Sequence, residues 1–272
     1  MTEATTAASS GPSKGSLLIV GTGITGVGQI TLEALYAIEH AEQLYYIAND
    51  NISEAWLKDR NPTARTLSDL YGERKSRRLS YVEMAARVVL TVRKGLRVCV
   101  AIYGHPGVFV QFSHVAIRSL RRQGYHARML PGVSADGCLI ADIGFNPGDH
   151  GVQSFEASDF LMFRRRHDPT SALVLWQVGV LGEPDAGRTQ RRQPERLRVL
   201  ARTLGRRYPD SHTVVLYQAN TFPSDPPLIK RLALKRLPDT RISPNATLFV
   251  PPLRQRPPDS RVKRWFARAS GD

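Results

Sequence analysis

Short apolar runs alternate with amphipathic stretches through the first 145 residues of the chain. The apolar runs predict buried strands at 16–23, 43–48, 96–104 and 126–130. The stretches between and after them predict helices at 29–41, 53–62, 81–95, 113–124 and 134–144. Alternating strands and helices are typical of a parallel sheet covered by helices. We therefore expect an α/β fold whose N-terminal half is a mostly parallel, doubly wound sheet.

The helix predicted at 81–95 has the clearest signal of the set. Its expected apolar stripe, at helical spacing, consists of Val82, Ala85, Val89 and Val92. Gly95 follows the last periodic residue and suits the C-terminal end of a helix, where the chain often turns into a left-handed conformation.

The second half of the chain has a different pattern. Its apolar runs predict strands at 172–180, 212–220, 228–234 and 245–252, around one helix at 194–208. We therefore expect a mixed, strand-rich C-terminal domain. The expected division is a lead-in at 1–14, an α/β domain at 15–147 that includes a Tyr/Arg segment at 65–95, a second domain at 148–253, and a Pro/Arg-rich tail at 254–272.

Composition narrows the class of protein. The sequence has no apolar run of membrane-spanning length, and its polar start lacks the basic-then-apolar order of a signal peptide. Cys99 and Cys138 both stand in apolar surroundings, which favours buried thiols in a reducing compartment. We expect a cytoplasmic protein without a membrane partner.

The formal net charge of +14 raises the alternative of a nucleic-acid partner. The arginine runs, such as 164–166 and 188–192, are not interleaved with the aromatic residues that stack on single-stranded bases. We favour a solvated basic surface, or one that faces an acidic partner such as a peptide leader, over a nucleic-acid site.

Two glycine-rich turns follow predicted strands. In GTGITGVG, Gly21, Gly23 and Gly26 fit the dinucleotide-binding spacing, and Asp50 lies where that motif places its acidic residue. In YGHPGVF at 103–109, glycines permit close approach of a ligand to the backbone while proline stiffens the turn. A nicotinamide or flavin site therefore remains one alternative.

The order of the turns YGHPGVF and MLPGVSA, together with GTGITG, resembles the tetrapyrrole-methylase superfamily of class III methyltransferases over residues 15–253. The resemblance implies S-adenosylmethionine, with S-adenosylhomocysteine as product, in a cleft between two α/β domains, and no metal. It implies a cofactor site formed by Tyr103, His105, Val108, Ser134, Ala135, Gln177, Ala219, Ala246 and Thr247.

Further segments narrow the resemblance to the borosin peptide-backbone N-methyltransferases. These are LYGERKSRRLSYVEMA, YGHPGVFV, MLPGVSADGCLIADIGFNP, SFEASDF, LWQVGV and HTVVLY. Fungal members carry their substrate as an apolar C-terminal core peptide, whereas the tail at 254–272 is rich in Arg and Pro. The sequence therefore looks like the split, bacterial type, which implies a separate precursor peptide as substrate and a homodimer.

Methylating a backbone amide requires removal of its proton, because the nitrogen lone pair is delocalised into the carbonyl. A tyrosinate beside an arginine can take that proton while the arginine holds developing negative charge. Arg77 and Tyr81 share a face if their segment is helical. By resemblance, Tyr81 is the base, Arg77 its activator, Tyr71 orients the peptide, and Tyr103 lies near the transferred methyl.

Two other functions compete with this one. One is a class III methyltransferase that acts on a tetrapyrrole or on RNA, and the basic composition favours RNA between these two. The other is a non-catalytic protein of the same fold that binds peptide or nucleic acid.

Overall fold

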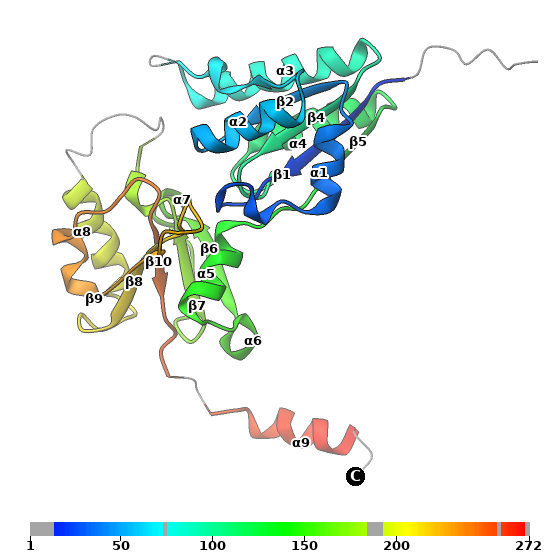
Figure 1. Ribbon diagram of the computed structural model, residues 1–272. Coiled ribbons are helices and arrows are strands. Elements are labelled where there is room, and N and C mark those ends of the chain that lie inside the picture. The colour runs from blue at the N-terminus through cyan, green and yellow to red at the C-terminus, as the bar shows by residue number, and fades with distance from the viewer. Residues whose placement is uncertain (1–13, 73–74, 184–192, 255–256, 270–272) are drawn as a thin grey trace, which may run out of the picture. The chain divides into compact units, whose positions relative to one another are not determined.

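A computed structural model describes residues 14–72, 75–183, 193–254 and 257–269 (Figure 1). The lead-in predicted at 1–14 lies outside these ranges except for Lys14. Contacts divide the chain into two compact units, Met1–Leu139 with Ala219–Pro226, and Ile140–Gln218 with Pro227–Asp272. The domain boundary at 147/148 stays a prediction.

The first unit contains a five-stranded sheet in which every pairing is parallel. Its strand order is β3-β2-β4-β1-β5, so the central strands are β4 and β1. The strands are β1 (Ser16–Gly21), β2 (Gln43–Ile47), β3 (Arg65–Thr66), β4 (Arg97–Ile102) and β5 (His126–Leu130). The helices and 3₁₀ turns are η1 (Gly26–Gln29), α1 (Leu32–Glu39), α2 (Asn51–Arg60), η2 (Ser68–Leu70), α3 (Arg77–Arg93) and α4 (Gln111–Arg122). This confirms the predicted parallel sheet. The boundary between the two units falls within α5 (Ala135–Ile143).

Both faces of this sheet are buried. Val98, Val100 and Ile102 of β4 belong to the core that includes α3 and α4. Cys99 and Ala101, the alternate residues of the same strand, belong to the core that includes α1 and α2. The strand is apolar at successive positions because each of its faces packs against helices, as parallel strands generally do.

Helix α3 begins earlier than predicted, and it buries Ala85, Val89 and Val92 of the predicted stripe but not Val82. Ser76 caps its first turn by accepting a hydrogen bond from the Leu79 N–H. The buried residues are Ser80, Met84, Ala85, Val88, Val89 and Val92. Val82 is 57% exposed, so its place in the predicted stripe was wrong. Gly95 has the positive φ, +90°, expected just beyond the helix.

The second unit contains a mixed five-stranded sheet, with order β6-β7-β10-β8-β9. Its β6–β7 pair is parallel and its other pairs are antiparallel. The strands are β6 (Val152–Glu156), β7 (Ala172–Trp176), β8 (Thr213–Gln218), β9 (Leu228–Ala233) and β10 (Thr247–Val250). The helical elements are α6 (Pro147–His150), α7 (Ala157–Met162), η3 (Val178–Val180), α8 (Gln193–Leu204) and η5 (Leu234–Asp239). Apolar residues of α8 and β7 share one core with the central strands.

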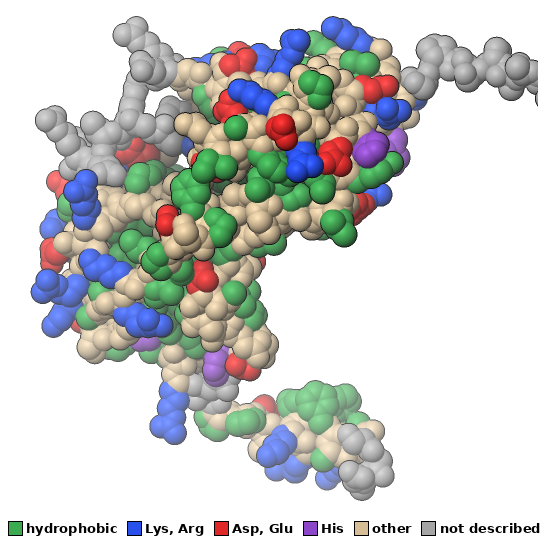
Figure 2. Space-filling view, in the orientation of Figure 1, with side chains coloured by type: hydrophobic (Ala, Val, Ile, Leu, Met, Phe, Trp, Pro, Cys, Tyr) green, Lys and Arg blue, Asp and Glu red, His purple; other side chains and the backbone are tan. Residues whose placement is uncertain are grey.

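The tail contains a helix that the sequence analysis did not expect, α9 (Ser260–Ala269). Val262, Trp265 and Phe266 follow helical spacing and are all exposed, on a helix whose other residues are mostly basic (Figure 2). Its high arginine content obscured this periodicity.

The surface in Figure 2 carries Lys and Arg side chains singly and in small groups, with acidic and apolar side chains between them. Cys99 and Cys138 are both buried, as expected. Among the helices of the described ranges, none is both long enough and apolar enough to cross a membrane.

Candidate functional site

Three glycine turns meet at the carboxyl ends of β1, β4 and β5. Gly104 donates its N–H to the Gly23 carbonyl at 2.6 Å, and Gly23 donates back at 3.4 Å. A Cβ at Gly21 would lie 2.4 Å from the Gly104 carbonyl oxygen, and one at Gly132 would lie 2.7 Å from the same atom. These glycines are therefore required because the turns pack backbone against backbone, a cause that the sequence analysis did not foresee. We name Gly21, Gly23, Gly104 and Gly132 the glycine cradle.

Asp50 has a local structural role. It is the N-cap of α2, and its Oδ1 accepts a hydrogen bond from the Ser53 N–H at 2.7 Å. Its Oδ2 accepts the Ser53 hydroxyl at 2.7 Å. A capping carboxylate explains the acidic residue at this position without a ribose, which removes the main support for a dinucleotide site.

The turn after β4 is tightly bonded within itself. The His105 Nδ1 accepts the Gly107 N–H at 3.0 Å, and the His114 Nε2 hydrogen-bonds the Gly107 carbonyl at 2.9 Å. Val108 is 43% exposed at this edge. Phe109 has φ +58°, a strained conformation for a residue with a bulky side chain. The cofactor roles predicted for His105 and Val108 stay predictions.

Arg77 and Tyr81 of α3 come together with Tyr71 and Tyr103, which follow η2 and β4; we call these four residues the tyrosine cluster. The rings of Tyr71 and Tyr81 lie edge to face, with centroids 6.5 Å apart. Tyr81 also lies 6.0 Å from the Phe112 ring, and its hydroxyl donates to the Phe109 carbonyl at 3.5 Å. Arg77 and Tyr81 lie one turn apart in α3, which confirms that their segment is helical.

The electrostatics of the cluster show that its members interact. Burial raises the pKa of Tyr71, the nearby Tyr81 raises it further, and Arg77 opposes the shift. Burial also raises the pKa of Tyr103, against the lowering effect of Arg77. Tyr71 and Tyr103 nevertheless keep 40% and 44% of their surface exposed. Both are therefore neutral phenols near neutral pH that a substrate can reach.

Two further predicted residues lie where α5 begins, after β5. Ser134 donates its hydroxyl to the Asp136 carboxylate, and its carbonyl accepts the Cys138 N–H at 3.1 Å. Ala135 is the first residue of α5. Both positions are half-buried and follow Gly132 of the glycine cradle closely.

Ala219 lies in the first unit although it follows β8 of the second sheet. The next residue, Asn220, offers its carbonyl to the Thr25 hydroxyl at 3.4 Å. A Cβ at Gly26 would lie 3.8 Å from the Thr221 carbonyl oxygen. The segment Ala219–Pro226 thus contacts the first glycine turn. No local sequence pattern could predict this long-range contact.

The remaining residues predicted to bind the cofactor lie at one end of the second sheet; they are Gln177, Ala246 and Thr247. Gln177 has φ +58°, and the next residue, Val178, donates its N–H to the Ala246 carbonyl at 3.1 Å. Thr247 is buried and pairs with Tyr217 in β8. The positive φ of Gln177 is a conformation that residues with a side chain rarely adopt, and the cofactor roles predicted for these three residues stay predictions.

Within the described ranges, no group of three or more His, Cys, Asp or Glu side chains is placed to hold a metal ion. Phe109 and Phe112, which contact Tyr81, were missed by the sequence analysis. The turn YGHPGVF contained Phe109, but nothing in its letters indicates a positive φ or a hydrogen bond to Tyr81.

Comparison with known proteins matches residues 16–237 to the family Tetrapyrrole (Corrin/Porphyrin) Methylases. The fold agrees with solved structures of that kind. Uroporphyrin-III-C-methyltransferase from Thermus thermophilus aligns over 88% of this chain and 92% of its own, with TM-score 0.62 and 20% identity. Cobalt precorrin-4 methyltransferase aligns over 87% and 94%, with TM-score 0.62 and 18% identity.

Curated relatives are more similar in sequence. A methyltransferase/ribosomally synthesized cyclic peptide gymnopeptides precursor of Gymnopus fusipes is 39% identical over 262 residues, covering 95% of this chain and 62% of the relative. The omphalotin A precursor of Omphalotus olearius, likewise named a methyltransferase, is 40% identical over 242 residues, covering 88% and 58%. The chain thus spans about three fifths of the length of these relatives, whose names join methyltransferase and peptide precursor.

Proposed function

The chain belongs to the tetrapyrrole (corrin/porphyrin) methylase family, and from that premise we propose that it methylates backbone amide nitrogens of a ribosomally made precursor peptide. The observation that carries the proposal is the tyrosine cluster, in which Arg77 lies within electrostatic reach of Tyr71 and Tyr103 and one helical turn from Tyr81. The names of the fungal relatives support the same substrate class.

A peptide amide is a poor nucleophile, and its proton must leave as the methyl arrives. Burial keeps Tyr71 and Tyr103 protonated, so these two phenols serve as hydrogen-bond donors to the peptide carbonyl. We assign the role of proton acceptor to Tyr81. Its hydroxyl donates to the Phe109 carbonyl across a long 3.5 Å contact, which it can give up at small cost.

Arg77 is exposed at the start of α3 and fixed in charge. Its guanidinium favours the anionic forms of the neighbouring phenols and of the amide after proton loss. In the proposed step Tyr81 accepts the amide proton and Arg77 stabilises the negative charge left on the amide, while a bound S-adenosylmethionine would supply the methyl group that the nitrogen takes.

The glycine cradle fits a bound nucleoside-type cofactor. Its turns bring backbone groups to the carboxyl ends of the strands, where ligands of open α/β sheets bind. S-adenosylmethionine supplies an activated methyl on a sulfonium when bound. Residues of this chain that we propose to hold it in the first unit are Tyr103, His105, Val108, Ser134, Ala135 and Ala219. In the second unit they are Gln177, Ala246 and Thr247.

We propose further that the substrate is a separate peptide and that the enzyme is a homodimer. The names of the fungal relatives indicate a ribosomally synthesized peptide as the substrate class and join it to the methyltransferase in one chain, whereas residues 254–272 themselves are rich in Arg and Pro and do not resemble an aliphatic core peptide. Analytical ultracentrifugation tests the dimer directly.

The proposal is tested by incubating the protein with S-adenosylmethionine and a synthetic peptide that has a helical leader and a Val/Ile-rich C-terminus. Tandem mass spectrometry then locates each added methyl. We expect backbone N-methylation of the apolar residues, with none when the cofactor is withheld. Methyl groups on the protein's own residues would refute the separate substrate. Methylation of a tetrapyrrole or a structured RNA instead of the peptide would refute the peptide function.

A further inference from the structure

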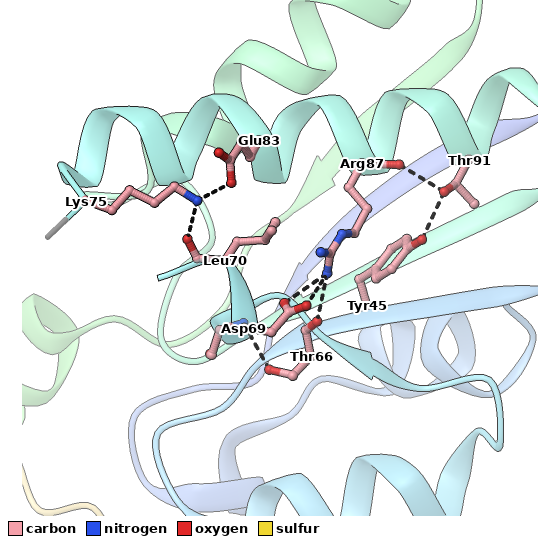
Figure 3. A network of polar contacts seen from close by, with 9 residues as sticks. Tyr45, Thr66, Asp69, Leu70, Lys75, Glu83, Arg87 and Thr91 are labelled. Carbon is pink, nitrogen blue, oxygen red and sulfur yellow. Dashed lines mark hydrogen bonds and ion pairs between the residues drawn. The ribbon is translucent and has the colours of Figure 1, made fainter. Parts of the chain in front are cut away.

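Helix α3 carries a polar stripe beside the chemistry proposed for it. Glu83, Arg87 and Thr91 follow one another at intervals of four residues, so they lie along one face of the helix. Tyr81 lies on another face, toward Phe112. Figure 3 shows this stripe directed toward the segment that contains Thr66, Asp69 and Leu70. This segment leads directly into Tyr71.

Two cations connect the stripe to that segment. The Arg87 Nη1 donates to both carboxylate oxygens of Asp69, at 2.9 and 2.8 Å, and lies 3.5 Å from the Thr66 carbonyl oxygen. The Lys75 Nζ donates to the Leu70 carbonyl at 2.8 Å and also pairs with Glu83. We call these contacts the α3 clamp.

The Lys75 contact acts on the peptide group of Tyr71 itself. The Leu70 carbonyl and the Tyr71 N–H belong to one planar peptide unit. Fixing this carbonyl therefore fixes the direction in which the Tyr71 backbone leaves the segment. The Tyr71 N–H is held at the other end of the unit by the Ser68 carbonyl, at 3.1 Å.

The clamp is suited to positioning more than to overall stability. The Lys75 and Arg87 side chains are 22% and 33% exposed, and their acidic partners 39% and 48%. Ion pairs exposed to this degree contribute little to the free energy of unfolding. Their hydrogen bonds to the carbonyls of Thr66 and Leu70, however, restrict the one short segment that places Tyr71 against Tyr81.

We propose that Lys75 and Arg87 are positioning residues that hold the Tyr71 ring against Tyr81 for methyl transfer. This inference rests on the proposed function and deepens it. Both side chains contact the segment that leads into Tyr71. Each acts through Tyr71, by way of the backbone of residues 66–70.

The first measurement is independent of activity. Hydrogen–deuterium exchange of the peptide that covers residues 66–72 should rise about tenfold in Lys75→Met and in Arg87→Met, because the clamp opens locally. Lys75→Arg, which keeps the charge and the donors, should restore most of the protection. The matched controls are Lys58→Met and Arg60→Met, which break the Lys58–Glu54 and Arg60–Glu39 pairs elsewhere in the first unit. Unchanged exchange in both clamp variants would overturn the proposal.

The second measurement is a double-mutant cycle with Tyr71→Phe in the peptide assay. In the wild-type background, Lys75→Met should lower kcat about tenfold or more with little change in the cofactor Kd. In the Tyr71→Phe background the same change should cost almost nothing, because the hydroxyl that the positioned ring carries into the cluster is gone. Equal losses in both backgrounds would refute positioning through Tyr71. A wild-type protein that methylates no peptide would refute the proposed function, and the exchange measurement would still decide whether the clamp holds Tyr71.

Discussion

Replacing Tyr81 with phenylalanine removes one oxygen atom from the tyrosine cluster and leaves its packing in place. The ring would keep its edge contact with Tyr71, at 6.5 Å between centroids, and its contact with Phe112 at 6.0 Å. The hydroxyl donates to the Phe109 carbonyl at 3.5 Å, which is the outer limit for such a bond. We therefore expect the free energy of unfolding to change by less than about 0.5 kcal/mol.

The effect on turnover should be far larger. Loss of a general base lowers a rate by ~10²–10⁴, which corresponds to about 3–5 kcal/mol of transition-state stabilisation. Tyr71 and Tyr103 are poor replacements, because burial raises the pKa of each and keeps it protonated. The difference between an almost unchanged stability and a rate reduced by orders of magnitude is the signature expected of a base.

The assay is single-turnover methylation of the peptide followed by mass spectrometry, with cofactor affinity measured by calorimetry and stability by urea unfolding. Tyr103→Phe and Tyr71→Phe serve as matched controls, since each removes one phenol from the same cluster. Near-normal turnover in Tyr81→Phe together with an inactive Tyr71→Phe would move the base to Tyr71. Normal turnover in both would refute the mechanism.

Three further predictions concern stability. Gly132→Ala should lower the free energy of unfolding by ~1–3 kcal/mol in urea, because the new Cβ would lie 2.7 Å from backbone atoms of the glycine cradle. The control Gly137→Ala should not destabilise the protein, because the space around Gly137 is open. Asp50→Ala should lower the free energy of unfolding by about 1 kcal/mol, because α2 loses its N-cap, and it should leave cofactor affinity intact. A loss of cofactor affinity would restore the interpretation of a dinucleotide site. Burial raises the pKa of Tyr208 to about 12, so stability should fall as pH rises from about 10 toward 12, where the unfolded chain loses its phenol proton first. Tyr208→Phe should reduce this fall in stability. At lower pH it should be neutral or stabilising, since the buried Tyr208 hydroxyl has no hydrogen-bond partner in the described part of the chain. An unchanged pH dependence in Tyr208→Phe would contradict the assignment of the fall to Tyr208.

The first sheet was predictable because its strands obey a local rule. A strand packed by helices on both faces needs apolar residues at every position, and the run from Val98 to Ile102 has them. The stripe of α3 was less predictable. Val82 fits the helical spacing but is exposed, whereas Val88 is buried. The spacing alone does not indicate which of two neighbouring faces of the helix packs against the sheet.

Elements that depend on distant partners were missed. Strand β6 is only half-buried and was not recognised, since just one of its edges is paired, with β7. The segment Ala219–Pro226 belongs to the first unit through contacts with residues about 195 positions earlier, such as the Thr25–Asn220 hydrogen bond. Hydrophobic periodicity indicates which face of a helix or strand is buried, but it does not reveal which distant segment covers that face.

The tyrosine cluster depends both on local helical spacing and on contacts between segments that are distant in the sequence. Helical spacing alone places Arg77 one turn from Tyr81. Tyr103 lies in the cluster because it follows β4, a central strand of the sheet. Tyr71 lies in the cluster because Lys75 and Arg87 hold its segment against α3. Spacing therefore predicts one pair, whereas the sheet order and the α3 clamp bring in the other two phenols. A chain that kept Arg77 and Tyr81 but lost the polar stripe should still form the helix, while its Tyr71 would no longer be held beside Tyr81.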